Sequence, residues 1–125
     1  MTTDRLEQIR DRLRQFTEER DWAQFHTPKN LAMAVVSESG ELAAELRWVE
    51  GARSDEFVRT SPGQERVAQE VADVAISLLL FCNGAEIDLL EAVEQKIESN
   101  AVRHPVELAR GNSLRPRVNE TGDPT

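Results

Sequence analysis

The sequence predicts an all-α protein, a four-helix bundle that assembles into dimers or tetramers. Apolar residues recur at helical spacing in four segments that are joined by short polar connections. Aromatic residues make up only 5% of the chain and tyrosine is absent, which disfavours a β-sandwich or barrel. The length of 125 residues, with 39% hydrophobic and 30% charged residues, is typical of one soluble domain.

The first two helices are indicated by their apolar stripes and their caps. The first covers about residues 4–20, with Thr3 as the expected N-cap. Its stripe has spacings of three and four residues and consists of Leu6, Ile9, Leu13 and Phe16. The second covers about residues 28–49, because Thr27 is a favourable N-cap and Pro28 suits the first helical position.

A polar connection separates the second helix from the third. Residues 51–61 show no apolar pattern and are expected to form a loop. Ser61 and Gln64 have the spacing of a capping box, so the third helix is expected to start there. It should end at residues 83–84, an Asn-Gly pair.

The last helix is expected to begin at a second capping pattern. Asp88 and Glu91 provide that pattern, and the helix covers about residues 89–102. Residues 1–105 then form one helical domain. The segment 106–125 contains several helix breakers and few apolar residues, and is expected to be an irregular tail.

Charge and composition exclude several functions. A net charge of −8 argues against binding to a nucleic-acid polymer. The longest apolar stretch, residues 71–82, contains Asp73 and is too short to span a bilayer, so no membrane partner is expected. The N-terminal residues lack an apolar signal region, and a single cysteine, Cys82, favours a reducing compartment. We therefore expect a cytoplasmic protein.

The third helix is apolar on nearly all sides, which a small bundle struggles to cover. This composition favours self-association, with the helix at the centre of the assembly. The alternative is that the same helix lies in the middle of a monomeric bundle.

Two pairs of acidic residues lie at the edges of apolar helix faces. Glu38 and Glu41 are three residues apart on the second helix, and Glu70 and Asp73 have the same spacing on the third. Since an ionised carboxylate in apolar surroundings is costly unless it is paired or metal-bound, Asp73 is the most informative of the four. Four oxygen ligands of this kind match a hard divalent cation, Mg²⁺ or Mn²⁺.

Other interpretations of these acids remain. Either pair can be an ordinary solvated helix face. Zinc is disfavoured because His26 and His104 are far apart in the sequence, and a di-iron site because no Glu-x-x-His occurs. Gly40, between the first two acids, costs a helix about 1 kcal/mol relative to alanine, which suggests a packing need or a site.

Polar and aromatic side chains complete the candidate set. Lys96 and Asn100 share a face of the last helix and suit a phosphate chain, unless the lysine simply packs its stem inward. Trp22, His26 and Trp48 can stack on a base, since such stacking is worth about 1–3 kcal/mol, or can plug the end of the bundle.

Four segments together resemble a known family. They read RDWAQFHTPKNL, SESGELAAELRW, QEVADVAISLLL and KIESNAVRHPVELARG, and they follow one another over most of the chain. Their order and spacing resemble the MazG-like all-α nucleoside-triphosphate pyrophosphohydrolases, with the dCTP pyrophosphatase group the most similar. Any one segment alone would be a weak match.

The resemblance implies a bundle of the all-α NTP pyrophosphatase type and a house-cleaning activity. A (deoxy)nucleoside triphosphate, dCTP or a modified dCTP among the candidates, would be cleaved between its α and β phosphates, giving the monophosphate and pyrophosphate. The resemblance further implies a dimer or tetramer with sites formed from more than one subunit. It implies Mg²⁺ held by the four acids named above, a base pocket lined by Trp22, His26 and Trp48, and phosphates near Lys96 and Asn100.

Two positions depart from the dCTP-preferring animal members. Ser77 stands where those members have a tyrosine in the nucleoside pocket, and Leu13 where they have a histidine. The preferred base is therefore open, whereas the four acids match. Either Glu38 or Glu41 would orient the attacking water.

Two other functions stay open alongside this one. One is a helical dimerisation or nucleotide-sensing module without turnover, and the other is a pyrophosphohydrolase of phosphoribosyl-ATP.

Overall fold

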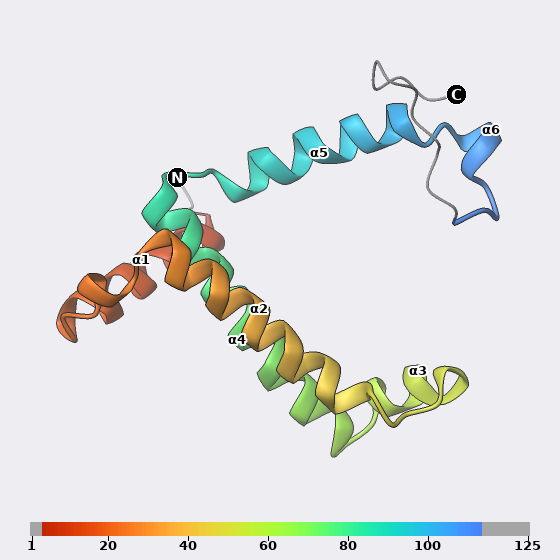
Figure 1. The fold of residues 1–125 in the computed structure, drawn as a ribbon, viewed down its shortest axis with the longest axis horizontal. Helices are drawn as coiled ribbons and strands as arrows, with labels where there is room; N and C mark the ends of the chain where they lie inside the picture. The colour runs from red at the N-terminus through yellow and green to blue at the C-terminus, as the bar shows by residue number, and fades with distance from the viewer. Residues whose placement is uncertain (1–3, 114–125) are drawn as a thin grey trace. The chain divides into compact units, whose positions relative to one another are not determined.

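A computed structural model describes residues 4–113. The chain forms two compact units, and the boundary between them in the sequence lies between Ile87 and Asp88. All regular secondary structure in residues 4–113 is helical, which confirms the predicted all-α class (Figure 1). The elements are α1 (Arg5–Glu19), the 3₁₀ turn η1 (Ala23–Phe25), α2 (Pro28–Leu46), α3 (Gly51–Arg59), α4 (Gly63–Ala85), α5 (Leu89–Arg103) and α6 (Val106–Ala109).

The caps of α1 and α2 are short side chains. Asp4 caps α1 by accepting a 3.2 Å hydrogen bond from the backbone N–H of Leu6, and the predicted cap, Thr3, lies outside the described residues. The Oγ1 of Thr27 accepts from the backbone N–H of Asn30 at 3.2 Å, as predicted. Helix α2 ends at Leu46, three residues earlier than expected.

The expected loop at residues 51–61 is wrong, because nine of these residues form α3. This helix packs on α4, and its Phe57 lies against the first residue of that helix, Gly63. A Cβ atom on Gly63 would overlap the carbonyl oxygen of Phe57, so only glycine permits this close approach. The packing of α3 on α4 is therefore a tertiary contact, which the polar sequence of α3 does not reveal.

Both ends of α4 differ from the prediction. Ser61 does not cap the helix; its hydroxyl donates to the carboxylate of Glu65 at 3.0 Å, and Pro62 is the residue before the first turn. At the other end the helix continues through Gly84 to Ala85. It stops at Glu86, which adopts the left-handed conformation with φ 56°.

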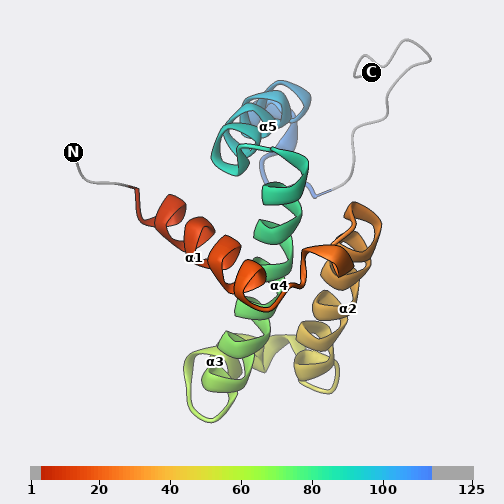
Figure 2. The same ribbon diagram turned by 90° about the vertical axis from the view of Figure 1, so that its left-hand side faces the viewer.

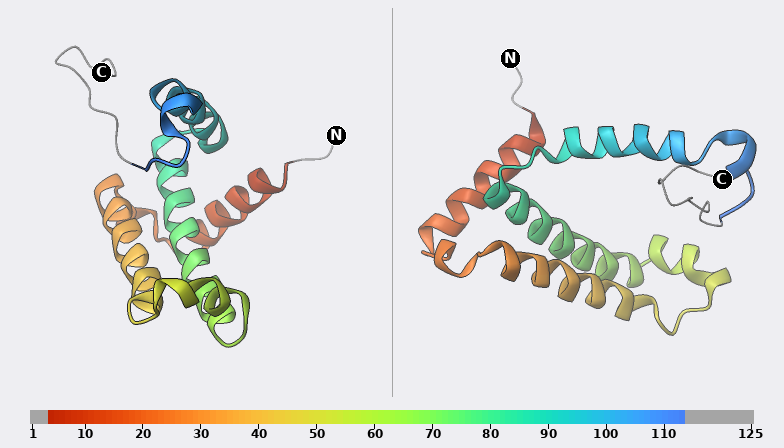
Figure 3. Two further views of the ribbon diagram at one scale, coloured as in Figure 1. Left: turned by 90° about the vertical axis from the view of Figure 1, so that its right-hand side faces the viewer. Right: turned by 45° about the horizontal axis from the view of Figure 1, so that its top comes forward.

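Helices α2 and α4 form the most extensive helix pair of the first unit and run antiparallel, side by side (Figure 1; Figure 3, right). Helix α1 crosses α4, as Figure 2 shows, and α3 packs near the start of α4. Only three apolar residues in the described chain are buried, namely Leu31, Leu79 and Cys82. Cys82 packs as a small hydrophobic residue.

Much apolar surface of α4 stays exposed. Val71, Ile76 and Leu78 retain 48%, 40% and 37% of their accessible surface. By length and composition α4 would also be able to cross a membrane, a criterion that the central helix of a soluble protein can meet as well. An unpaired apolar face of this kind commonly marks a protein interface.

A buried arginine joins α1 to the end of α4. The Nε of Arg10 donates to Oδ1 of Asn83 at 2.7 Å, and its Nη2 donates to the carbonyl of Ile87 at 3.1 Å. The Asn83 amide donates back to the carbonyl of Arg10 at 3.3 Å. Arg10 is 6% exposed, so these bonds replace the water that its guanidinium would otherwise hold.

The second unit contains α5 and α6. Asp88 caps α5 by accepting from the backbone N–H of Glu91 at 3.1 Å, as predicted. The tail was expected to be irregular, but Val106–Ala109 forms one helical turn after Pro105. The predicted domain boundary after residue 105 stays a prediction.

Arg10→Ala should lower the free energy of unfolding by about 1–3 kcal/mol, because it leaves the Asn83 amide and the Ile87 carbonyl without their buried donor. Chemical denaturation measures the change. Arg12→Ala, which truncates an exposed arginine of the same helix, is the control and should change stability little. Equal effects of the two substitutions would contradict a structural role for Arg10.

Candidate functional site

Three carboxylates from two helices meet in the first unit. Glu38 lies on α2, and Glu70 and Asp73 lie on α4, with one ligand oxygen of each within 4.8 Å of the others. They form the one group of this kind in residues 4–113. One acid of the first predicted pair, Glu38, and both acids of the second pair therefore lie in a single group.

The antiparallel register of α2 and α4 places these acids opposite one another. Residues three or four apart share a face of a helix, and Glu38 and Glu41 share one face of α2 as Glu70 and Asp73 share one of α4. Glu38 lies with both Glu70 and Asp73 in one group. Glu41 lies outside the group of three but close enough for its charge to act on Glu70.

The environment of Glu70 disfavours its charged form. Partial burial raises the pKa of Glu70 above its ordinary value, and the charges of Asp73, Glu41, Glu38 and Glu45, in that order, raise it further. Repulsion of this kind is relieved by a cation placed among the carboxylates.

One expectation for Asp73 is wrong. Its surroundings were expected to be apolar, whereas its side chain is exposed in the structure, and Glu38 and Glu70 are half-buried. The carboxylates are thus accessible to a ligand from solvent. With oxygen donors alone, the group suits a hard cation such as Mg²⁺ or Mn²⁺ better than zinc.

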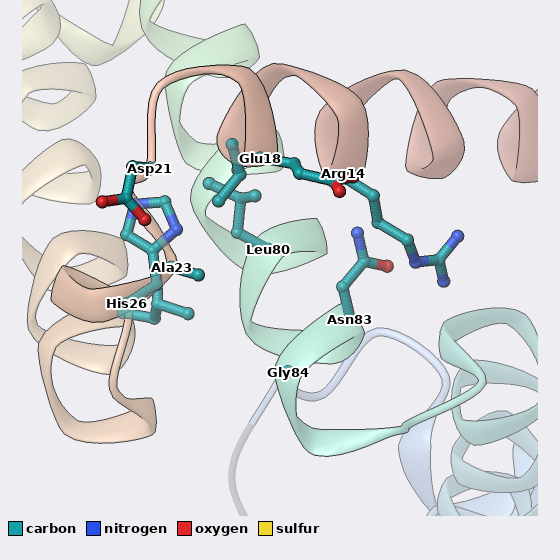
Figure 4. Close-up of a pocket in the computed structure, with 10 residues that line it drawn as sticks. Arg14, Glu18, Asp21, Ala23, His26, Leu80, Asn83 and Gly84 are labelled. Atoms are coloured by element: carbon teal, nitrogen blue, oxygen red, sulfur yellow. The ribbon is translucent and has the colours of Figure 1, made fainter.

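A pocket of about 480 Å³ opens beside η1, between α1, α2 and α4 (Figure 4). His26 lies on one side of it, Leu80 at the back, and Arg14 with Asn83 on the other side. The lining also includes Thr17, Glu18, Asp21, Ala23, Leu31 and Gly84. It combines an apolar wall with several hydrogen-bonding groups, which is typical of small-molecule sites.

The pocket and the acids share one seam between the two helices. Leu80 lies seven residues beyond Asp73, so it is on the same face of α4, about 10 Å further along the axis. Leu31 lies seven residues before Glu38 on α2 and is in the corresponding position. The seam therefore leads from the carboxylates to the pocket.

The structure brings two of the three predicted ring residues together. Trp22 lies edge-on to His26 with ring centroids 6.4 Å apart, and edge-on to Phe16 at 5.7 Å. Trp48 is elsewhere, at the opposite end of α2. It is 86% exposed beside a separate hollow lined by residues that include Phe57 and Arg53. Since α2 has 19 residues and spans about 28 Å, one base cannot touch both His26 and Trp48 of the same chain.

The other residues predicted for the substrate site lie in different parts of the structure. Ser77 follows Asp73 by one turn and is buried, with 9% of its surface exposed. Leu13 lies in another hollow, on the side of α1 that carries Ile9 and Phe16. Lys96 and Asn100 are exposed on α5, in the second unit, and their role at the site stays a prediction.

Several pocket residues were missed. Thr17 and Asn83 line the pocket, and the hydroxyl of Thr17 is buried without a hydrogen-bond partner among residues 4–113. Asn83 served only as a helix-stop signal in the sequence. The hydroxyl of Thr17 could have been noticed as a polar group beside the apolar stripe of α1.

The chain is similar to curated proteins and to a solved structure. No family model matches the chain. Mouse dCTP pyrophosphatase 1 is 41% identical over 88% of this chain, and the human protein of the same name is 37% identical over 86%. The chain spans about 65% of the length of these curated relatives.

A solved structure is matched over nearly its whole length. The crystal structure of a pyrophosphatase from Archaeoglobus fulgidus aligns with a TM-score of 0.78 and 36% sequence identity. The alignment covers 84% of this chain and 96% of the archaeal one.

Glu70→Gln should stabilise the metal-free protein at about pH 7, because it removes a charge that the neighbouring acids repel. The folded-state pKa of Glu70 is raised, so its favourable contribution is present at low pH and is lost as the pH rises through that pKa. The gain should therefore disappear at about pH 4. Thermal unfolding in EDTA at the two pH values measures it.

The exposed Glu56→Gln on α3 is the control and should behave like the parent protein. Added Mg²⁺ should raise the melting temperature of the parent more than that of Glu70→Gln. A Glu70→Gln variant that is less stable than the parent in EDTA would contradict the repulsion.

Proposed function

The chain belongs to the MazG-like all-α pyrophosphatase family, and we propose on this basis that it is a divalent-metal-dependent pyrophosphohydrolase of nucleoside triphosphates. Its products would be the monophosphate and pyrophosphate, and dCTP and modified dCTP are the first substrates to test. The observation that carries the proposal is the group of three carboxylates on facing helices. A non-catalytic helical module does not need such mutually repelling acids next to an open pocket.

The residues present fit Mg²⁺. Glu38, Glu70 and Asp73 would hold it, since carboxylate oxygens are the ligands that Mg²⁺ prefers. When bound, the ion supplies charge neutralisation and Lewis-acid polarisation of the phosphate oxygens. The site is accessible from solvent, because Asp73 is exposed.

Glu41 is the carboxylate that we assign to the attacking water. It is exposed, acts electrostatically on Glu70 and lies outside the group of three, so it is available to accept a proton. The water oxygen forms a bond to the α-phosphorus while the bond from that phosphorus to the bridging oxygen breaks. Pyrophosphate leaves with the electron pair, and the proton of the water passes to Glu41.

The pocket beside His26 is suited to the base. It is on the same seam as the acids, about 10 Å along α4 from Asp73 to Leu80, so an extended nucleotide can reach from one to the other. His26 and Trp22 provide ring surfaces, and the hydroxyl of Thr17 provides an unpaired polar group. These groups can orient a base. The nucleophile of the proposed reaction is water, so no nucleophilic side chain is needed.

A second copy of the chain would complete the site. Val71, Ile76 and Leu78 of α4 remain exposed, and burying apolar surface of this kind drives self-association. Because Trp48 is too far from His26 within one chain, we propose that Trp48 serves the pocket of another copy. The assembly would be a dimer or a tetramer, and sedimentation distinguishes these from a monomer.

The cellular setting is also a proposal. The net charge of −8 and the single, buried Cys82 favour a cytoplasmic protein whose ligand is a free nucleotide and neither a nucleic-acid polymer nor a membrane. Lys96 and Asn100 would contact the phosphates of that nucleotide.

Glu41→Gln should lower kcat by about 10²–10⁴-fold, because it removes the proton acceptor, while Mn²⁺ still binds. Asp73→Asn should lose both turnover and Mn²⁺ binding. Pyrophosphate release and calorimetric Mn²⁺ titration measure the two properties, and circular dichroism checks the fold. Full turnover in Asp73→Asn would contradict the proposed carboxylate site. Loss of Mn²⁺ binding in Glu41→Gln would show that Glu41 is a metal ligand.

Trp48→Ala should raise KM about 5- to 100-fold with a smaller effect on kcat, because base stacking contributes about 1–3 kcal/mol. A panel of canonical and modified nucleoside triphosphates with Mg²⁺, analysed by chromatography, identifies the substrate first. A mixture of Trp48→Ala and His26→Ala chains should recover activity if the two residues act from different copies. Unchanged KM in Trp48→Ala would contradict stacking.

A further inference from the structure

We propose that Arg66 and Glu45 form a positioning pair, which sets the register of α2 on α4 and thereby assembles the carboxylates of the metal site. Neither residue belongs to the proposed site itself. The inference rests on the proposed function, since it names what holds the metal-binding acids in place.

The contact between the two side chains is close and partly buried. Nη2 of Arg66 lies 2.8 Å from Oε2 of Glu45. The Glu45 side chain is 17% exposed and that of Arg66 is 61% exposed. Within residues 4–113 the buried Glu45 oxygen has no hydrogen-bond partner, so the ion pair with Arg66 is the contact that compensates its charge. Loss of Arg66 would therefore leave a buried carboxylate oxygen without a compensating charge, which favours movement of α2 or α4.

The pair also differs from the other ion pairs of the described chain. Those pairs join neighbours within α1, at its C-terminal cap or within α3. Only Arg66 and Glu45 connect two helices, and the helices they connect are those that carry the acids. A single charged contact between two antiparallel helices specifies which residues lie opposite each other.

The spacing of residues links this contact to the acids. Four residues before Glu45 on α2 is Glu41, and four residues after Arg66 on α4 is Glu70. A further three-residue step in each direction reaches Glu38 and Asp73. Equal steps along antiparallel helices keep residues level, so the register at Arg66 determines that of the whole cluster.

Charge gives the pair a distinctive signature. If Arg66 acted only through its electric field, its removal would tighten cation binding, since a positive charge near the site disappears. Removal of the Glu45 charge would weaken it for the same reason. If the pair acts by positioning, both removals weaken binding, and the two hypotheses therefore predict opposite signs for Arg66.

The experiment measures Mn²⁺ affinity of the full chain by calorimetry for Arg66→Gln, Glu45→Gln and the swapped double variant Arg66→Glu/Glu45→Arg. We expect each single variant to bind Mn²⁺ about 10- to 100-fold more weakly, the range found when groups that orient metal ligands are removed. The swap should restore most of the affinity. Arg59→Gln, which breaks the exposed pair with Asp55 on α3, is the matched control and should bind as the parent does.

Three results would overturn the inference. Parent-like or tighter binding by Arg66→Gln excludes positioning and leaves the proposed function intact. Failure of the swap to restore affinity shows that the contact does not set the register. Absence of Mn²⁺ binding in the parent overturns both the inference and the proposed function.

If Arg66→Gln does not fold, a conservative substitution at the same position still tests the inference. Arg66→Lys keeps the charge but changes the shape of the contact. Positioning predicts weaker Mn²⁺ binding with unchanged helical circular dichroism, whereas an effect of charge alone predicts parental binding and would contradict the pair.

Discussion

The antiparallel packing of α2 on α4 is the constraint on which the other features of the first unit depend. It brings Glu38 to Glu70 and Asp73, and it continues from these acids to the pocket walls at Leu31 and Leu80. Between the acids and the pocket lie the small residues Ala34 on α2 and Ser77 on α4, and small side chains of this kind allow two helices to approach closely. One interface thus carries both the proposed chemistry and the proposed recognition.

Two features limit how strongly the packing of α2 on α4 stabilises the fold. The acids repel one another, and the buried apolar residues of the described chain are few. A ligand that binds only the folded state adds stability through mass action, as does a partner subunit. A site built from repelling acids and exposed apolar faces is therefore consistent with a protein that is completed by a cation and a second copy. The repulsion among the carboxylates is what favours the binding of a cation.

Local sequence signals predicted the helices that have their own caps, and tertiary contacts explain the rest. Thr27 with Pro28 and Asp88 are read directly from the sequence, because a cap bonds to a backbone N–H two or three residues away. Helix α3 was missed because its sequence is polar and its packing on α4, where Phe57 lies against Gly63, is a tertiary contact. The two acidic pairs were identified from spacing, but the register of one helix on the other could not be read from the sequence. For the same reason the exposure of Asp73, the buried Arg10 and the contact of Arg66 with Glu45 could not be foreseen.

The central claim is that carboxylates from two helices hold one divalent ion. Crystals grown with Mn²⁺ and a non-hydrolysable nucleoside triphosphate, with anomalous diffraction recorded at the manganese edge, test it most directly. The account predicts an anomalous peak bonded to Glu38, Glu70 and Asp73, with the nucleotide phosphates beside it. A well-ordered structure with nucleotide bound and no peak at these carboxylates would contradict it.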